Sequence, residues 1–284
     1  MQLFTNNSWL RFLFPSLLIL TALAFAQTSA IKSEVKTLYV GVYNYAPYAV
    51  ADEQGNYQGL TPDLISLLNR HQTQYHFEIY PVSPKRRYQA FANAQYDMIF
   101  FENPDWGWES TDFLSTAAFH SDGDIYVALA DKDRDQHFFD DLKALKILGI
   151  SGFHYGFAGF NADEDYLHQN FNILLSWSNE RNLELLCERN GDVAVMGKAY
   201  LRDFFIHHPD MSKDFLLSER YDQRFHHYIL LRPKAGIDLA IMERLLGELR
   251  SNGELGELFS RYGVPACSDN LLTQAGQMQD ACLF

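Results

Sequence analysis

The sequence predicts an α/β protein of two lobes, each built on a mainly parallel sheet flanked by helices. Short β-rich runs alternate with amphipathic helical stretches, which is typical of a parallel sheet covered by helices. This alternation occurs twice in tandem, and one further strand-like segment follows each series. The repetition indicates two lobes, and the extra segments indicate two crossings between them.

The first series extends over residues 36–101. We expect strands at 36–44, 76–82 and 96–101, separated by helices at 59–72 and 83–95. Each helix begins with Thr or Ser followed by Pro, a pair that favours helix initiation, and Thr61 is expected to cap the first helix. This order predicts the parallel sheet of the first lobe.

The second series extends over residues 146–208. We expect strands at 146–151, 172–178 and 192–197 and helices at about 155–169, 179–191 and 198–208. The segment SGFHYGFAG (151–159) runs from the end of a strand into the helix expected at 155. The free N–H groups and the dipole at that helix start would favour an anionic group. The order again predicts a parallel sheet with helices on both faces.

The crossings and the C-terminal helices complete the domain assignment. Segments 124–130 and 225–233 are expected to pair as strands at the two hinge crossings, and 236–263 has apolar positions at helical spacing. Because the chain crosses twice, its last helices return to the first lobe. We therefore assign 36–123 plus 225–265 to lobe 1, 124–224 to lobe 2 and 266–284 to a C-terminal tail. Ligands in such sheets bind at the carboxyl ends of the strands, which is the cleft between the lobes.

Composition limits the class of partner. The 284 residues are 47% hydrophobic and 15% aromatic, as expected of a folded globular protein. A formal net charge of -13 argues against a nucleic-acid partner, because no basic stripe can replace the counterions of a phosphate backbone. We expect a soluble monomer with a small-molecule ligand.

The N-terminus indicates the compartment. Residues 12–26 form an apolar run ending in Ala24-Phe25-Ala26, a small-x-small cleavage pattern. We expect a signal peptide over residues 1–26, cleaved after 26 or 30, and a periplasmic mature protein. An uncleaved anchor is the alternative, because only Arg11 supplies positive charge before the run.

Three cysteines fit an oxidising compartment. Cys267 and Cys282 bracket the polar tail, and a disulfide between them would stabilise it by about 3 kcal/mol in the chain-entropy model. Cys187 lies within a helical pattern and is expected to be a buried free thiol.

The order of motifs resembles the bacterial extracellular solute-binding proteins of family 3, the amino-acid-type periplasmic components of ABC transporters. Residues 38–68 are similar to the family's opening strand, Tyr-x-Pro-aromatic turn and first helix. Residues 91–100 resemble the end of its second helix, with Ala94 where Gly is usual. Segments 139–156, 183–197 and 246–263 resemble later signatures. The resemblance implies a type II periplasmic binding protein fold and a membrane permease partner.

The residues that specify an α-amino acid in this family are not matched. The resemblance implies an Arg after the third strand that clamps the ligand carboxylate, but residues 100–114 (FFENPDWGWESTDFL) contain no Arg, and Trp106 falls near its place. It also implies a second-lobe Asp that holds the ammonium, where this sequence has Gly197. The expected ligand is therefore a small polar molecule with an aromatic or cationic part rather than a simple α-amino acid.

Eight side chains are candidates for the cleft. By the resemblance, Tyr45 aligns with a ligand-stacking aromatic and Arg87 with an Arg that relatives carry after a Pro. Glu102 could accept a hydrogen bond from an amine, and the aromatic candidates offer stacking or cation–π faces. Core packing or solvated surface charge is the alternative for each. The full set is Tyr43, Tyr45, Arg87, Glu102, Trp106, Trp108, His154 and Tyr155.

Metal, cofactor and catalytic motifs are weak. The run 131–142 begins like a calcium loop but has Gln136 at the Gly position and Leu142 at the Glu position. The pairs His207-His208 and His226-His227 lack metal-site spacing and are expected to be exposed. We expect no metal, no cofactor and no catalysis. The alternatives are a sensor module and, through relatives that resemble dehydratases of cyclic acids, an enzyme that uses Glu102 or His154.

Overall fold

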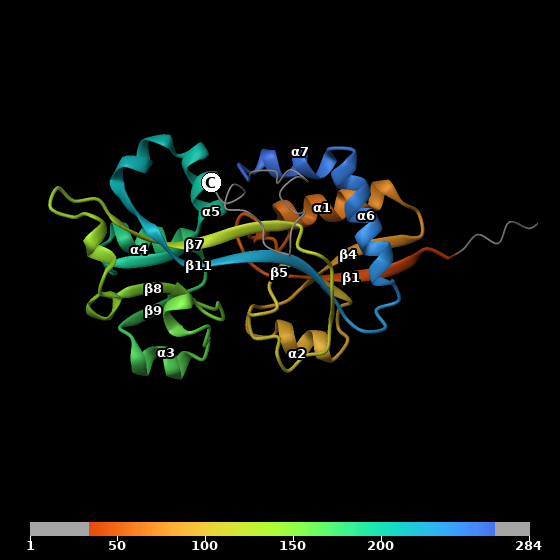
Figure 1. Cartoon of the computed structure of the whole chain (residues 1–284), viewed down its shortest axis with the longest axis horizontal. Helices are drawn as coiled ribbons and strands as arrows, with labels where there is room; N and C mark the ends of the chain where they lie inside the picture. The colour runs from red at the N-terminus through yellow and green to blue at the C-terminus, as the bar shows by residue number, and fades with distance from the viewer. Residues whose placement is uncertain (1–33, 265–284) are drawn as a thin grey trace, which may run out of the picture. The chain divides into compact units, whose positions relative to one another are not determined.

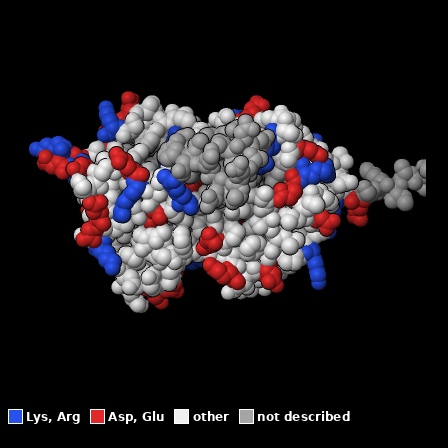
Figure 2. Space-filling view, in the orientation of Figure 1, with Lys and Arg blue, Asp and Glu red and all other residues white. Residues whose placement is uncertain are grey.

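The computed structural model of the chain describes residues 34–264 (Figure 1). The expected signal peptide at 1–26 and the expected Cys267–Cys282 disulfide in the tail at 266–284 lie outside the described residues. Within 34–264, no helix is both long and apolar enough to cross a membrane. Charges of both signs are interspersed over the described surface visible in Figure 2, without the basic stripe that nucleic acid requires.

One sheet of nine strands runs through both lobes in the order β4-β1-β5-β11-β7-β10-β8-β9, and β6 pairs with β11. In the first lobe, β1 (Lys36–Val42) is parallel to β4 (Tyr75–Pro81) and to β5 (Met98–Glu102). A short strand, β6 (Leu114–Ser115), lies beside β11, and β2 (Val50–Ala51) and β3 (Tyr57–Gln58) form a separate small sheet. The parallel order confirms the expected β-α-β-α-β series.

Helices cover both faces of the first-lobe sheet. One core is formed with α1 (Leu60–His71), α6 (Leu239–Ser251) and α7 (Glu254–Arg261), and another lies under α2 (Arg87–Ala92) (Figure 1). The expected cap of the first helix is wrong: Gly59 is the N-cap, at φ 120°, and Thr61 is buried inside the helix.

The second lobe has the same organisation. β8 (Ile147–Ile150) is parallel to β9 (Ile173–Ser176) and to β10 (Val193–Gly197). One core includes α4 (Asn179–Cys187) and α5 (Lys198–His207), and the other includes α3 (Glu164–Asn170) (Figure 1). Four short 3-10 helices complete the described part of the lobe, at Gln136–Phe139, Leu142–Ala144, Gly156–Ala158 and Pro209–Asp214.

Two long antiparallel strands connect the lobes (Figure 1). β7 (His120–Leu129) and β11 (Phe215–Leu231) pair from Phe215 opposite Leu129 to His227 opposite His120. β11 also pairs with β5 of the first lobe, while β7 pairs with β10 of the second. The expected crossings are confirmed, and β11 begins ten residues earlier than its apolar pattern predicts.

Two sequence-based expectations for the second lobe are wrong. The segment 155–169 is a 3-10 turn followed by the seven-residue helix α3, because Gly159 and Phe160 adopt positive φ and end the turn. Cys187 is exposed rather than buried, since it lies at the last position of α4 on the side away from the core.

Candidate functional site

The carboxyl ends of strands from both lobes meet around one small cavity. Tyr43 and Tyr45 follow β1, and Trp106 follows β5 by four residues, while Phe153 and His154 follow β8 in the second lobe. The two crossing strands also contribute to the wall. The cavity has a volume of about 20 Å³ and is lined by Tyr43, Tyr45, Arg87, Trp106, Asp124, Phe153, His154 and Gln223.

Aromatic rings form most of the cavity wall. Tyr43 and Tyr45 stack with ring centroids 6.0 Å apart and an interplanar angle of 8°. Phe153 and Trp106 each meet Tyr45 edge to face, at 5.7 Å and 6.1 Å. A wall of aromatic rings is a suitable environment for a cation or a planar ring.

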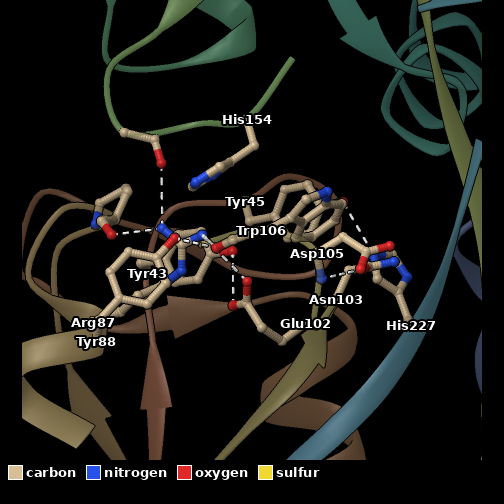
Figure 3. Close-up of polar contacts among 12 residues, drawn as sticks. Tyr43, Tyr45, Arg87, Tyr88, Glu102, Asn103, Asp105, Trp106, His154 and His227 are labelled. Atoms are coloured by element: carbon tan, nitrogen blue, oxygen red, sulfur yellow. Dashed lines mark hydrogen bonds and ion pairs between the residues drawn. The ribbon is translucent and has the colours of Figure 1, made fainter. Parts of the chain in front are cut away.

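A buried ion pair lies at the end of β5, where the segment that carries Trp106 begins. Arg87 and Glu102 are 2% and 0% exposed, with Arg87 Nη2 3.3 Å from Glu102 Oε1, and Tyr43 donates its hydroxyl to the other carboxylate oxygen at 3.2 Å (Figure 3). Burial raises the pKa of Glu102, and the guanidinium opposes that rise. Glu102 is therefore turned into lobe 1 toward Arg87.

The remaining Arg87 donors bind backbone carbonyls. Nη1 donates to Pro84 O at 2.6 Å and to Gly152 O of the second lobe at 3.2 Å, and Nη2 donates to Trp106 O at 3.4 Å (Figure 3). Of the three Arg87 side-chain nitrogens, only Nε has no hydrogen-bond partner among the described residues. Arg87 therefore braces the segment at Trp106 and links the two lobes.

Gln223 and His154 complete the second-lobe side. Gln223 accepts a hydrogen bond from Trp106 Nε1 at 3.1 Å and donates to Asp124 Oδ2 and to His154 O, each at 2.7 Å. The imidazole of His154 points toward Arg87 (Figure 3), and burial together with that guanidinium lowers the pKa of His154 to about 3. Its ring is neutral at physiological pH.

Three carboxylates, those of Asp122, Asp124 and Asp222, lie near one another where the two crossing strands meet the second lobe. Burial raises the pKa of Asp122 to about 6, and burial with the charges of Asp222 and Asp122 raises the pKa of Asp124. Tyr48 OH and the Ala199 N–H donate to Asp122. Of the three, Asp124 lines the cavity.

A buried histidine pair lies behind Tyr45. His120 and His227 stack at 5.2 Å with an interplanar angle of 14°, and their Nδ1 atoms are 2.9 Å apart. Tyr45 OH is 3.1 Å from His227 Nε2. The expectation that His226-His227 is exposed is wrong: His227 is fully buried because its side chain alternates inward on β11, and His226 is half-buried.

A larger cleft of about 540 Å³ adjoins the small cavity, and Tyr45 and Phe153 line both. Its described lining includes Trp177, which is 70% exposed, and residues from α5 such as Tyr200 and Asp203. Tyr45 and Phe153 thus separate the small cavity from a wider opening.

The structure distributes the eight expected site residues between cavity and core. Tyr43, Tyr45, Arg87, Trp106 and His154 line the small cavity. Trp108 is fully buried against Tyr88 and Phe91, and Tyr155 packs in the second lobe with its hydroxyl bonded to the Ile150 N–H. Sequence analysis did not identify Asp124, Phe153 or Gln223, the remaining lining residues.

The anion site expected at the helix start near residue 155 is filled by a side chain of the protein, Asp222. The Asp222 carboxylate accepts from the N–H groups of Gly156 at 2.7 Å and Phe157 at 2.8 Å, and Tyr126 OH donates to it at 2.7 Å. These N–H groups do bind a carboxylate as expected, but the carboxylate belongs to β11 of the same chain and not to a ligand.

Within the described residues, no group of three or more His, Cys, Asp or Glu side chains is arranged to hold a metal ion. The cavity can chemically do two things: hold a cation with Asp124 and the aromatic faces, and order a planar group between the rings.

Solved structures of periplasmic binding proteins share this fold. An arginine transport periplasmic binding protein from Legionella pneumophila has a TM-score of 0.62 at 17% identity, over 80% of this chain and 99% of that one. A substrate-binding protein of an ABC uptake transporter from Streptococcus pneumoniae, with bound histidine, has a TM-score of 0.65 at 12% identity, over 82% and 95%.

A third structure is an ancestral amino-acid-binding protein described as a precursor of cyclohexadienyl dehydratase, with a TM-score of 0.61 at 15% identity over 80% of this chain and 95% of that one. No curated protein matches the sequence. Residues 38–265 match the sequence family of bacterial extracellular solute-binding proteins, family 3. That match spans both lobes, so the chain belongs to the bacterial extracellular solute-binding proteins of family 3.

Proposed function

We propose that this protein captures a small polar molecule with a cationic or aromatic part between its lobes and delivers it to an ABC permease. The observation that carries the proposal is the cavity itself, which takes aromatic walls from both lobes and a carboxylate from a crossing strand. Family membership supports a small-molecule ligand and a permease partner. The Legionella and Streptococcus structures are named for arginine and histidine, whose side chains also carry a basic group.

Binding works by hinge closure. A cavity of about 20 Å³ has room for about one water, so a ligand enters only when the lobes separate. Closure then desolvates the ligand between Tyr45 and Trp106 on one side and Phe153 and His154 on the other. Inter-lobe contacts such as Arg87 to Gly152 O and Lys85 to Glu164, at 2.6 Å, are consistent with a closed form.

We extend the proposal to the organisation of the mature protein. Lobe 1 comprises 36–123 plus 225–265 and lobe 2 comprises 124–224. The chain is secreted to the periplasm through a cleaved signal peptide and acts as a monomer. A Cys267–Cys282 disulfide fastens the tail. Mass spectrometry of the secreted protein, with and without reductant, tests the cleavage site and the disulfide together.

The binding proposal is tested by a thermal-shift screen of amines, cyclic amino-acid derivatives and sugars. A ligand at 100 times its Kd stabilises the folded state by about 2.7 kcal/mol, which for a protein of this size raises Tm by about 5 to 10 °C. Trp106→Ala and Tyr45→Ala are expected to abolish the shift, while Tyr39→Ala, an exposed tyrosine of β1, keeps it. A shift lost only in Trp177→Ala would place the ligand in the larger cleft instead.

We propose a binding protein rather than an enzyme because Glu102, one of two acid–base candidates, is paired with Arg87 and does not line the cavity. Mass spectrometry of a bound hit after prolonged incubation tests this. Conversion of the ligand, lost in His154→Asn with binding retained, would instead establish an enzyme. A permease-binding assay separates transport from delivery to a sensor.

A further inference from the structure

Asp124 and Gly197 face each other on neighbouring strands. The two residues are directly paired in the β7–β10 register. A Cβ added to Gly197 would lie 3.5 Å from Asp124 Oδ1 and 3.5 Å from Asp122 Oδ2. An acidic side chain at position 197 would therefore crowd two carboxylates, and like charges so close are unfavourable. An added Cβ alone would only be in ordinary van der Waals contact, so the conflict arises from the charge of an acidic side chain.

The charge of the cavity wall favours a cation. Arg87 is the single Lys or Arg among the described lining residues, and Glu102 neutralises it within the first lobe. Lys198, which follows Gly197, donates its Nζ to Tyr221 OH at 2.8 Å. The remaining charged lining residue is Asp124, so the cavity is net negative when that carboxylate is ionised.

A neutral acceptor lies in the same wall. His154 is 9% exposed, and its Nδ1 has no hydrogen-bond partner among the described residues. Burial and Arg87 hold the ring neutral, so in the tautomer that carries its proton on Nε2, Nδ1 is able to accept a hydrogen bond from a ligand N–H. An unpaired buried acceptor costs free energy, and a ligand donor would remove that cost.

We propose that Asp124 is the residue that selects the ligand, by binding its ammonium or amidinium group beside the rings of Tyr45, Trp106 and Phe153. The inference rests on the proposed binding function and goes further, because it predicts recognition of a positive group with no requirement for a ligand carboxylate. Gln223 fixes the geometry by donating to Asp124 Oδ2, while Asp124 Oδ1 lies on the side of Gly197, 3.5 Å from the position of an added Cβ.

The test uses two matched sets of probes, one aromatic and one aliphatic, and four variants. Benzylamine, phenylalanine and benzoate carry a cation, a zwitterion and an anion on the same ring, and agmatine and arginine form a second pair that differs in the carboxylate. Wild type is compared with Asp124→Asn, with the exposed control Asp105→Asn, with Gly197→Asp and with the double variant Asp124→Asn/Gly197→Asp. Affinities are measured by calorimetry.

The expected result is that cationic probes bind wild type and Asp105→Asn, and that Asp124→Asn weakens them by about 10- to 100-fold, as for loss of a charged hydrogen bond. Gly197 has a backbone conformation, φ -64° and ψ 137°, that any residue adopts, so the expected cost of Gly197→Asp comes from the nearby charges of Asp124 and Asp122, and Asp124→Asn removes the first of these. The double variant moves the carboxylate to the facing strand and is expected to recover most of the lost affinity.

Three outcomes overturn the inference. Binding of cations that is unchanged in Asp124→Asn removes Asp124 from recognition. Binding of benzoate or of the zwitterions alone refutes the charge selection while leaving the proposed binding function intact. Binding of none of the probes, of either charge, contradicts the binding function and the inference with it. Asn is isosteric with Asp and keeps the acceptor for Gln223, so circular dichroism is expected to show Asp124→Asn folded.

Discussion

The buried pair His120–His227 makes the stability of the fold depend on pH. Burial, followed by the charges of Arg202 and His226, lowers the pKa of His120 to about 3. Burial and His120 lower the pKa of His227 as well. A histidine with a depressed native pKa stabilises the fold above its unfolded pKa, near 6.5, and this contribution is lost as the pH falls. We therefore expect unfolding to become easier below about pH 6.5.

The magnitude follows from the difference in the pKa of His120 between the native and unfolded states. With a pKa of about 3 in the native state and about 6.5 in the unfolded state, His120 lowers the free energy of unfolding by about 2 kcal/mol between pH 7.5 and pH 5. Asp122 acts in the opposite direction. Its raised pKa of about 6 destabilises the fold at high pH and returns about 1.4 kcal/mol on going to pH 5.

The assay is urea unfolding at pH 7.5 and pH 5 for wild type and His120→Asn, with the exposed His168→Asn as control. His120→Asn removes ring contacts and is expected to be less stable at pH 7.5. Its loss of stability on acidification should nevertheless be smaller than that of wild type by about 2 kcal/mol, because the Asp122 contribution cancels in the comparison. An equal loss in wild type and His120→Asn would refute the reasoning.

Three further predictions, two of them with a matched control variant, are tested by urea unfolding. Ala94 adopts φ 56°, so Ala94→Gly should stabilise by about 0.5 to 1 kcal/mol; destabilisation would contradict the strain. Gly107→Ala should cost more than Gly159→Ala, since both have positive φ but only the first Cβ would meet a second-lobe histidine, at 2.7 Å; equal costs would refute that clash. Arg87→Met should cost about 3 to 5 kcal/mol and Lys85→Met at most about 1; similar costs would mean that burial of the Arg87 pair is unimportant.

Hydrophobic periodicity predicted most of the fold because it reports burial directly. The two β/α series and the crossings are present as expected. The first half of β11 was missed because residues 218–224 are mostly polar, and their pairing with β7 is set by register rather than by apolar alternation.

The site was predicted in part, for a related reason. Side chains next to strand ends, such as Tyr45 and Trp106, could be placed from the order of elements alone. Asp124 and His227 lie within the crossing strands β7 and β11. Their residue types alone do not indicate that these side chains are buried or line a cavity. Strand alternation applied to 120–129 and 215–231 would have placed Asp122 and Asp124 on one side together, and this is the signal that was available.

The pairing of β11 with β7 is irregular in one segment of the crossing between the lobes. The β7–β11 register shifts between Leu217 and Tyr221 and again between Tyr221 and Gln223, so this segment has fewer regular ladder bonds than the rest of the crossing. Bending should concentrate there. Gln223, at the end of that segment, is bonded to Trp106, His154 and Asp124. We therefore expect a change in the angle between the lobes to move the cavity wall, so that the proposed ligand binding depends on the flexing of this strand segment.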